Sequence, residues 1–300
     1  MDWLAAIEGT PEGRTVALGL ALFAAVAHAV FGALQKGRFD PWLTRGAIDI
    51  CYSAMALPVA LLLVPWPEGR AWAILLGAMA IHFVYKLCQA MAYTRGAFTV
   101  VYPIVRGSSP LVTVFIAGIA FNEHYTLVQW LGVLLLSGSI LALSAFNVAS
   151  VGIGRRRLVG AIGWALVTGI FVAAYTTYDA FGIRATPNPF TFLAWFFLFD
   201  GLIFPWIALA RWQAMPDPPD PGPLLRRGLV GGLVAYLSFG SIMLATRIDK
   251  VGQAAVLRET SVVFAALIGW AFLGERVGAL RPARVVLIAA GAIVMEFGGG

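Results

Sequence analysis

The sequence has 300 residues, of which 60% are hydrophobic and only 12% are charged. Soluble proteins carry about 25% charged residues, so this composition excludes an ordinary soluble domain and predicts a multi-pass membrane protein. The net charge of +6 lies mostly at the edges of the expected loops, where it bears on membrane orientation and gives no reason to expect a nucleic-acid partner.

Ten apolar runs are long enough to cross a bilayer, which takes about 20 residues. Their approximate bounds are 16–36, 44–65, 71–93, 97–121, 126–147, 158–181, 190–210, 224–247, 251–273 and 282–298. The connections are short and rich in proline, and none is long enough for a soluble domain. Any substrate must therefore bind between the helices. Cys51 and Cys88 both fall inside apolar runs, which predicts neither a disulfide nor a metal site.

The fourth run contains a polar stretch, Tyr-Pro-Ile-Val-Arg-Gly-Ser-Ser-Pro at 102–110. An arginine at the centre of a span costs at least about 2.5 kcal/mol on insertion scales, so Arg106 marks a functional site by default. Pro103 and Pro110 flank it and remove backbone donors. Two outcomes are expected equally: free carbonyls that line a cavity, or a simple kink.

An internal repeat relates the two halves of the chain. With a shift of 152 residues, 94–123 aligns without a gap on 246–275, and five of the identical positions are polar. Arg106 matches Arg258 in this alignment. Each half has five spans, an odd number, so the halves are predicted to be inverted repeats, 1–152 and 153–300, around a central cavity. Inverted repeats with a polar site at their interface are typical of secondary transporters.

Short motifs at equivalent places add a family resemblance. They are Gln-Lys at 35–36, Arg45, Ala-Tyr-Thr-Arg at 92–95, Phe-Asn-Glu at 121–123, Leu-Ser-Gly-Ser at 136–139, Leu-Gly-Glu-Arg at 273–276 and Ala-Ala-Gly-Ala at 289–292. Together with the duplication, they resemble the five-span unit of the drug/metabolite transporter superfamily, specifically of EamA-type transporters. Asn122 departs from the glycine that is usual there. The resemblance covers nearly the whole chain.

This resemblance implies an all-α ten-helix basket that works by alternating access, usually as an exporter, in the cell inner membrane. It also implies both termini in the cytoplasm. If the termini were cytoplasmic, most lysines and arginines of the expected loops would lie outside the cell, whereas such residues are normally enriched in cytoplasmic loops. The charge distribution therefore favours termini outside the cell. Orientation therefore stays open. A proton or a counter-substrate is expected to drive transport, and a homodimer is one possible assembly.

Helical spacing groups polar residues into stripes on three spans. The third span carries His82, Lys86, Gln89 and Tyr93, the fourth Tyr102, Arg106, Ser109 and Thr113, and the sixth Phe171, Tyr175, Tyr178 and Asp179. Charged stripes should face the interior, because exposure to lipid costs several kcal/mol for each charge. The predicted substrate-binding residues are Arg106, Lys86, Arg258, His82, Tyr102, Ser109, Gln89, Tyr93 and Tyr175.

Buried acids and a further histidine are candidates for proton coupling: His28, Asp179, Asp49, Asp200 and Glu259. The acids have an alternative role as counter-ions, in the pairs Arg106–Asp200, Arg258–Glu259 or Lys86–Asp179. Glu123 and Glu275 lie at span ends, where bonding to a helix end or a loop is expected.

The leading hypothesis is a secondary transporter for a small anionic or zwitterionic metabolite, held by arginine and lysine. An exporter of cationic drugs or amines is the alternative, with Asp179 and the tyrosines of the sixth span as an aromatic cage. A membrane enzyme or scaffold is disfavoured, since the sequence has no HExxH, Walker A or Gly-x-Ser-x-Gly motif. No cofactor or metal is expected.

Overall fold

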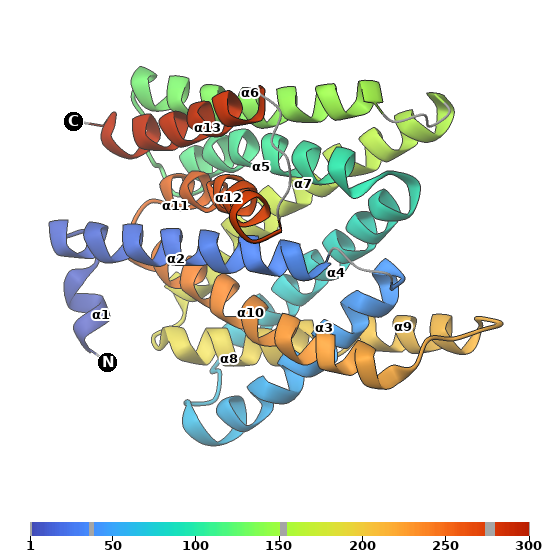
Figure 1. Ribbon diagram of the computed structural model, residues 1–300. Coiled ribbons are helices and arrows are strands. Elements are labelled where there is room, and N and C mark those ends of the chain that lie inside the picture. The colour runs from blue at the N-terminus through green and yellow to red at the C-terminus, as the bar shows by residue number, and fades with distance from the viewer. Residues whose placement is uncertain (1, 36–38, 151–154, 274–279, 300) are drawn as a thin grey trace.

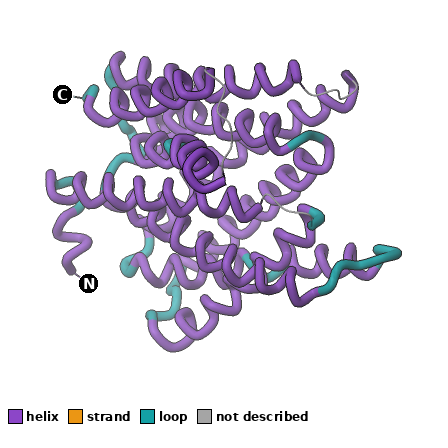
Figure 2. The backbone as a smooth tube through the Cα atoms, in the orientation of Figure 1, coloured by secondary structure: helices purple, strands orange, loops and turns teal. Residues whose placement is uncertain are grey.

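The computed structural model describes residues 2–35, 39–150, 155–273 and 280–299. All regular structure within these ranges is helical (Figure 2). The elements are α1 (Asp2–Ile7), α2 (Pro11–Gln35), α3 (Pro41–Pro58), η1 (Val59–Leu63), α4 (Ala71–Arg95), α5 (Phe98–Ala120), α6 (Leu127–Ser150), α7 (Arg155–Ala185), α8 (Pro189–Asp200), α9 (Phe204–Gln213), α10 (Pro221–Ile248), α11 (Val251–Arg258), α12 (Ser261–Leu273) and α13 (Leu280–Phe297).

Eight helical segments of the described chain are long and apolar enough to cross a membrane. They are Pro11–Gly32, Pro41–Leu63, Ala71–Arg95, Val100–Ala120, Leu158–Ala185, Pro189–Gln213, Pro221–Ile248 and Val251–Ile268. The fifth expected span contains a shorter apolar helix, Leu127–Ala142, and the tenth coincides with α13. The prediction of a multi-pass helical membrane protein is confirmed, and the number ten and the inverted repeat stay predictions.

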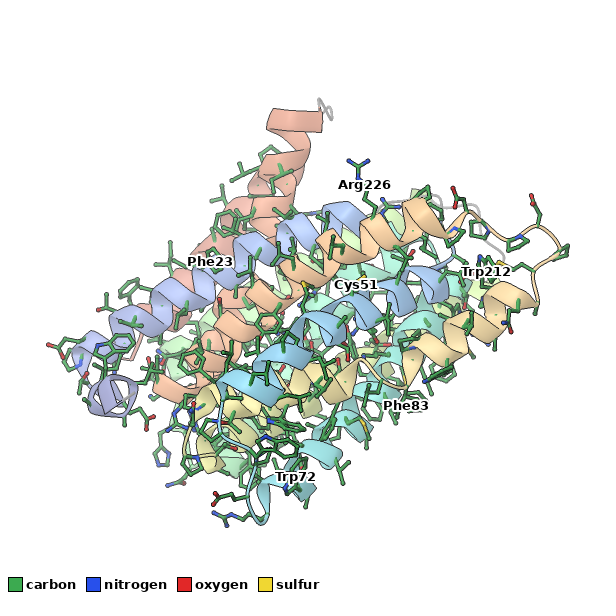
Figure 3. The ribbon with its side chains drawn as sticks, turned by 90° about the horizontal axis from the view of Figure 1, so that it is seen from below. Phe23, Cys51, Trp72, Phe83, Trp212 and Arg226 are labelled. Carbon is green, nitrogen blue, oxygen red and sulfur yellow. The ribbon has the colours of Figure 1, made fainter. Side chains whose placement is uncertain are left out.

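Large apolar side chains are exposed on the surface, while several charged side chains are buried in the largely apolar interior. Leu62 and Ile119 are 78% and 72% exposed, whereas Lys86 and Glu259 are each 1% exposed. Apolar side chains such as Phe23 cover the outside of the long helices (Figure 3). Such a surface suits lipid, and the charges withdrawn from it need partners inside the bundle.

Three of the long helices begin at an Asp-Pro or Asn-Pro pair. The side chains of Asp40, Asn188 and Asp220 accept hydrogen bonds from the backbone N–H groups at the starts of α3, α8 and α10. The proline that follows has no N–H to satisfy and is already in a helical conformation. These pairs therefore set where the helices re-enter the bundle.

Two expected spans are broken. The seventh is divided into α8 and α9 at 201–203, and the ninth into α11 and α12 at 259–260. The second break lies directly after Arg258. In the first half, by contrast, α5 continues without interruption through Pro103 and Pro110. Discontinuous helices at a buried polar site are a recurrent feature of secondary transporters.

Both ends of the chain lie on the same side of the bundle, at the left of Figure 1, together with the connections α3–α4, α5–α6, α7–α8 and α10–α11. We call this the termini side. The α9–α10 connection lies on the opposite side. Helices α6 and α13 pack along each other at one edge, where a Cβ atom added to Gly291 would lie 2.7 Å from the carbonyl oxygen of Gly132. The small residue pattern at 289–292 thus permits close packing of these two helices.

Candidate functional site

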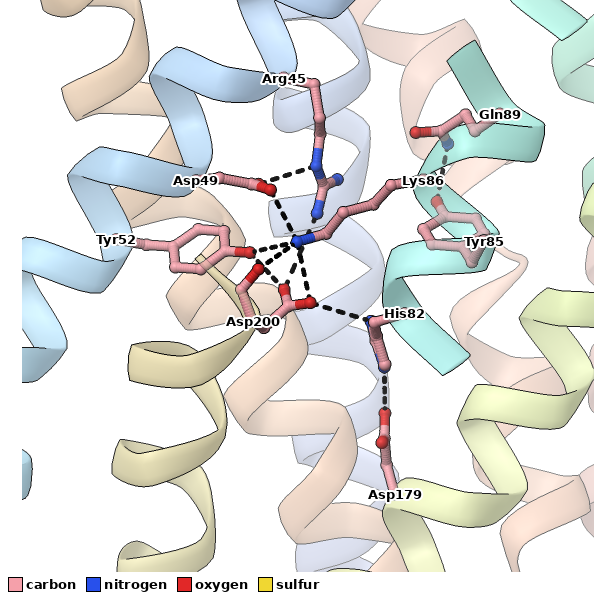
Figure 4. A network of polar contacts seen from close by, with 9 residues as sticks. All are labelled: Arg45, Asp49, Tyr52, His82, Tyr85, Lys86, Gln89, Asp179 and Asp200. Carbon is pink, nitrogen blue, oxygen red and sulfur yellow. Dashed lines mark hydrogen bonds and ion pairs between the residues drawn. The ribbon is translucent and has the colours of Figure 1, made fainter. Parts of the chain in front are cut away.

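A buried ion network joins α3, α4, α7 and α8 (Figure 4). The ammonium of Lys86 on α4 lies 2.6 Å from Asp49 Oδ2 on α3 and 2.8 Å from Asp200 Oδ1 at the end of α8. It also donates to the Tyr52 hydroxyl at 3.0 Å and to the Asp200 carbonyl at 2.6 Å. Lys86 is therefore fully occupied by protein groups in this conformation, and its partners are not the Asp179 that the sequence suggested.

Arg45 completes this network from α3. Its Nε lies 2.8 Å from Asp49 Oδ1, and its Nη2 lies 4.0 Å from Asp200 Oδ2. Tyr52 donates its hydroxyl proton to Asp200. Two cations thus face two carboxylates, which offsets the cost of removing all four charges from water.

His82 joins the network to α7. Its Nε2 lies 2.8 Å from Asp179 Oδ2, and its Nδ1 lies 3.9 Å from Asp200 Oδ1. The ring is only 2% exposed and packs against Tyr175, with the ring centroids 4.3 Å apart. His82 therefore connects Asp179 with the two cations and two carboxylates of the network.

A second charged cluster lies between α2, α5 and the break after α11. Arg106 Nη1 donates to Glu259 Oε1 at 2.9 Å, and Arg106 also contacts His28 on α2. Arg258 Nη2 lies 3.8 Å from the same Glu259 oxygen. The expected contact between Arg258 and Glu259 is thus present, whereas the expected partner of Arg106, Asp200, is wrong. The two arginines related by the repeat converge on one carboxylate.

Two narrow pockets lie beside these clusters, and Phe239 of α10 lines both of them. The first, which we call the α4–α5 pocket, has a volume of about 20 Å³, and the second, the α7–α10 pocket, has about 10 Å³. Each has room for about one water molecule. The α4–α5 pocket is lined by His28, Phe31, Gly32, Arg45, Tyr85, Gln89, Tyr93, Tyr102, Val105, Arg106, Val172 and Phe239. The α7–α10 pocket is lined by Tyr175, Thr176, Asp179, Phe239, Ile242, Met243, Thr246 and Arg258.

The pockets lie on different sides of Phe239 along the helices. The α4–α5 pocket includes Arg45 near the start of α3, which lies on the side opposite the termini. The α7–α10 pocket includes Thr246 near the end of α10, on the termini side. Phe239 packs near Tyr175, with ring centroids 6.1 Å apart. These two rings lie between the two pockets.

The remaining candidates divide between the pockets and the helix packing. Gln89, Tyr93 and Tyr102 line the α4–α5 pocket, where Gln89 donates to the Tyr85 hydroxyl at 2.7 Å and Arg106 lies over the Tyr102 ring. Ser109 is buried but lines neither pocket. Tyr178 also lies outside both, because its ring packs against Gly77 of α4.

Sequence reasoning missed several residues of the site: Arg45, Tyr52, Tyr85, Thr176 and Phe239. Arg45, Asp49 and Tyr52 follow one another at four- and three-residue spacing on α3, which is a signal of a shared face. Phe239 carries no such signal, since it is one of 20 phenylalanines.

The termini side is closed by contacts around Glu123. The Glu123 carboxylate accepts hydrogen bonds from the backbone N–H groups of Val251 and Gly252, and it lies 3.8 Å from Arg184 Nη2. Tyr125 donates to the same carboxylate, and burial together with the Glu123 charge raises the pKa of Tyr125. Glu123 thus bonds a helix end, as expected for its position; its repeat partner Glu275 lies outside the described residues.

Arg184 and Arg247 make further contacts on the termini side. Arg184 donates to the carbonyls of Thr246 and Asp249 at 2.8 Å, and Arg247 bonds Glu8 at 2.7 Å. The neighbouring Asn122 adopts a left-handed conformation with φ = 53°. Glycine enters that region without strain and asparagine tolerates it better than most residues, which explains why asparagine replaces the usual glycine here.

Comparison with known proteins agrees with this fold. Residues 159–297 match the model of the EamA-like transporter family. A solved structure, described only as the crystal structure of a protein, is similar over 96% of this chain and 98% of its own, with a TM-score of 0.76 and 15% sequence identity. That similarity shows a shared fold. No curated protein matches the chain. The described chain is thus a multi-pass helical membrane protein in which residues 159–297 are similar to an EamA-like transporter of the drug/metabolite transporter superfamily.

Proposed function

We propose that this protein is an alternating-access secondary transporter, built from two inverted five-helix repeats, that exports a small zwitterionic metabolite from the cell. The substrate class that the site fits best is an amino acid with an apolar or aromatic side chain. The proposal places the chain in the inner membrane as a ten-span protein, with 1–152 and 153–300 as its repeats.

Helix contacts support the repeat. Helix α2 packs on α10, and its equivalent in the second half, α7, packs on α4, which is the equivalent of α10. Likewise α5 packs on α7, and its equivalents α11 and α12 pack on α2. Helices α6 and α13, which are equivalent to each other, pack together. Exchange of the two halves thus maps contacting pairs onto contacting pairs, as a two-fold axis between inverted repeats requires.

The substrate assignment depends on the buried charged groups that are least fully paired with groups of opposite sign. Arg45 and Lys86 are matched by Asp49 and Asp200, and Arg106 is matched by Glu259. Two buried groups of opposite sign are less fully matched: Arg258 lies 3.8 Å from Glu259, which it shares with Arg106, and Asp179 pairs only with His82 among the described residues. Both line the α7–α10 pocket.

Three buried polar atoms in this pocket have no hydrogen-bond partner among the described residues: Arg258 Nε, Asp179 Oδ1 and Thr176 Oγ1. Buried polar atoms in proteins are rarely left without a partner, so a group that binds here is expected to supply one. An amino acid has a carboxylate for Arg258 and an ammonium for Asp179. Tyr175, Phe239, Ile242 and Met243 offer apolar surface to its side chain.

The same arrangement disfavours a purely cationic substrate. The cage of tyrosines that such a substrate needs is incomplete, because Tyr178 lies outside the pocket, against Gly77. Arg258 in the same pocket would also repel a cation, and a buried repulsion between like charges is only weakly screened. A simple carboxylate is disfavoured by Asp179 for the equivalent reason.

Alternating access accounts for the small size of the pockets. Neither pocket holds a metabolite in this conformation, and the termini side is closed by Glu123, Arg184 and Arg247. Substrate entry therefore requires the helices that carry Phe239 and Arg258 to move apart. The Glu123 contacts join the α5–α6 connection of the first half to α7 and α11 of the second, so opening toward the termini side would break them.

A matched set of three compounds tests the substrate class. L-Leucine, 4-methylpentanoate and isoamylamine share one side chain and differ in charge. We expect purified protein in detergent to bind only L-leucine by isothermal titration calorimetry. Arg258→Gln and Asp179→Asn should each weaken binding about 10–100-fold, because a hydrogen bond to a charged group contributes about 1.5–3 kcal/mol. Binding of isoamylamine alone would instead support the amine exporter, and binding of 4-methylpentanoate alone an anion transporter.

A further inference from the structure

The α4–α5 pocket differs from the α7–α10 pocket in the sign of its charge. Arg45 and Arg106 line the α4–α5 pocket, and no aspartate or glutamate is among the described residues that do so. The α7–α10 pocket, by contrast, is lined by one arginine and one aspartate. Asp49 and Glu259, which pair with the two arginines, do not line the α4–α5 pocket. Its charged lining groups are therefore cations.

Neutral hydrogen-bond donors complete this lining. Tyr85 accepts a hydrogen bond from Gln89 at 2.7 Å, so its own hydroxyl proton is left for another acceptor. Tyr93 and Tyr102 add two further hydroxyl groups to the lining. The Nε of Arg45 is ion-paired but makes no hydrogen bond within the described chain. Guanidinium and hydroxyl donors around one small space are suited to an anion, because hydrogen bonds to a charged acceptor are the stronger ones.

We propose that the α4–α5 pocket binds one small monovalent anion, of the size of chloride, between Arg45 and Arg106. Its volume of about 20 Å³ has room for about one water molecule, and a halide ion is little larger, whereas sulfate, phosphate and organic anions do not fit. The anion enters from the side opposite the termini, past Arg45. The Arg45 side chain is 12% exposed, whereas that of Lys86 is 1% exposed.

Glu259 links this anion site to the substrate pocket. Its Oε1 accepts a hydrogen bond from Arg106 Nη1 at 2.9 Å and lies 3.8 Å from Arg258 Nη2, and its Oε2 has no hydrogen-bond partner among the described residues. An anion at Arg106 weakens the attraction between that arginine and Glu259, so the carboxylate pairs more fully with Arg258. Arg258 is then less able to bind the substrate carboxylate. The anion and the substrate therefore disfavour each other, and this coupling rests on the proposed function.

Chloride binding to the purified, full-length protein in detergent is measured from the quadrupolar broadening of the chloride NMR signal. We expect broadening that bromide reverses by competition and that gluconate leaves unchanged, because gluconate is too large for the pocket. Gly32→Leu should abolish the broadening. Gly32 lines the pocket, and a Cβ atom added there meets no atom within 4 Å, so the new side chain fills the pocket and leaves both arginines in place.

Gly19→Leu is the matched control. Gly19 lies on the same helix, is exposed, and also has no atom within 4 Å of an added Cβ atom. This variant should broaden the chloride signal as the wild type does. Tyr85→Phe is a second test of the site, because it removes one donor and keeps the ring. Its chloride Kd should rise about tenfold or more, as expected for loss of a hydrogen bond to a charged group.

The link to the substrate is tested with L-leucine, titrated by calorimetry in sodium chloride and in sodium gluconate at equal ionic strength. We expect the Kd of L-leucine to be at least about fivefold higher in chloride, which is the lower end of the usual coupling between two sites. The difference should disappear in Gly32→Leu and persist in Gly19→Leu.

The outcomes separate this inference from the proposed function. Absence of chloride broadening in the wild type, or unchanged broadening in Gly32→Leu, overturns the anion site, whether or not L-leucine binds. If Gly32→Leu does not fold, an unchanged chloride Kd in Tyr85→Phe overturns it instead. Chloride binding with the same L-leucine Kd in both salts overturns the coupling through Glu259. Chloride binding without L-leucine binding in either salt overturns the proposed substrate and leaves the anion site standing.

Discussion

Replacement of Lys86 by methionine tests whether its ammonium holds the bundle together or holds substrate. The change removes the cation that lies 2.6 Å from Asp49 and 2.8 Å from Asp200, and Arg45 is then the one arginine or lysine of the network beside both carboxylates. Loss of one partner of a buried ion pair costs about 3–5 kcal/mol. We expect the free energy of unfolding to fall by that amount, since Lys86 and Asp49 are at most 1% exposed.

The double variant Lys86→Met/Asp49→Asn makes this prediction quantitative. It removes one carboxylate together with the cation and leaves Arg45 with Asp200. It should therefore be more stable than Lys86→Met by about 1–3 kcal/mol, which is the size of coupling expected for groups in one network. Unfolding is followed by steric trapping in detergent micelles. Lys250→Met is the control, because its ammonium makes an exposed hydrogen bond to the His124 carbonyl, and its effect should be about 0.5 kcal/mol or less.

A stable Lys86→Met protein that no longer binds L-leucine would refute this reasoning. It would return Lys86 to the role that the sequence suggested, as a ligand for the negative group of the substrate. The double variant also identifies this case. Asp49→Asn does not replace the Lys86 ammonium, so L-leucine binding should stay absent in Lys86→Met/Asp49→Asn. A stable variant with intact binding would mean that Arg45 alone neutralises both carboxylates.

Three further predictions concern Phe239 between the two pockets, the Glu123 contacts on the termini side, and the packing of α6 on α13. Phe239→Ala joins the two pockets that Phe239 now divides, and passive L-leucine efflux from proteoliposomes should rise at least tenfold, while Phe239→Tyr should keep the barrier. Glu123→Gln weakens the bonds to the start of α11 at a cost of about 0.5–2 kcal/mol, and a cysteine at Thr246 should then react faster with a maleimide from the termini side. Gly291→Ala places a Cβ atom 2.7 Å from the Gly132 carbonyl and should destabilise by about 1–3 kcal/mol, whereas Gly138→Ala, with no atom within 4 Å of its Cβ, should not destabilise.

Hydropathy predicted where helices cross the membrane but could not predict where they break. The runs at 190–210 and 251–273 are apolar enough to cross the membrane, as the unbroken runs are, and hydropathy reports only this composition. The break after Arg258 depends on tertiary contacts of Arg258 and Glu259. Proline was misleading in the equivalent place, since Pro103 and Pro110 lie inside one continuous helix. Neighbouring helices in a membrane can satisfy the backbone groups that a proline frees.

Helical phase predicted that charged residues face inward, and it could not predict their partners. His82 and Lys86 are both buried, as the stripe on α4 required. Their partners Asp49, Asp179 and Asp200 come from three other helices. The phase of one helix carries no information on which helix lies opposite, or at what depth its acids lie. The sequence therefore offered Asp179 as the alternative partner of Lys86, whereas Asp179 contacts His82.

The predicted duplication accounts for the unequal charges of the two halves. It supplies two equivalent arginines, Arg106 and Arg258, but the acid beside Arg258 has no counterpart, because Gly107 occupies the position equivalent to Glu259. Glu259 bonds Arg106 across the interface at 2.9 Å and is 3.8 Å from Arg258. A second acid at position 107 would neutralise both arginines and abolish the difference between the halves. In the proposed inverted repeat, an acid that is present in one half alone would therefore give the two halves different binding chemistry.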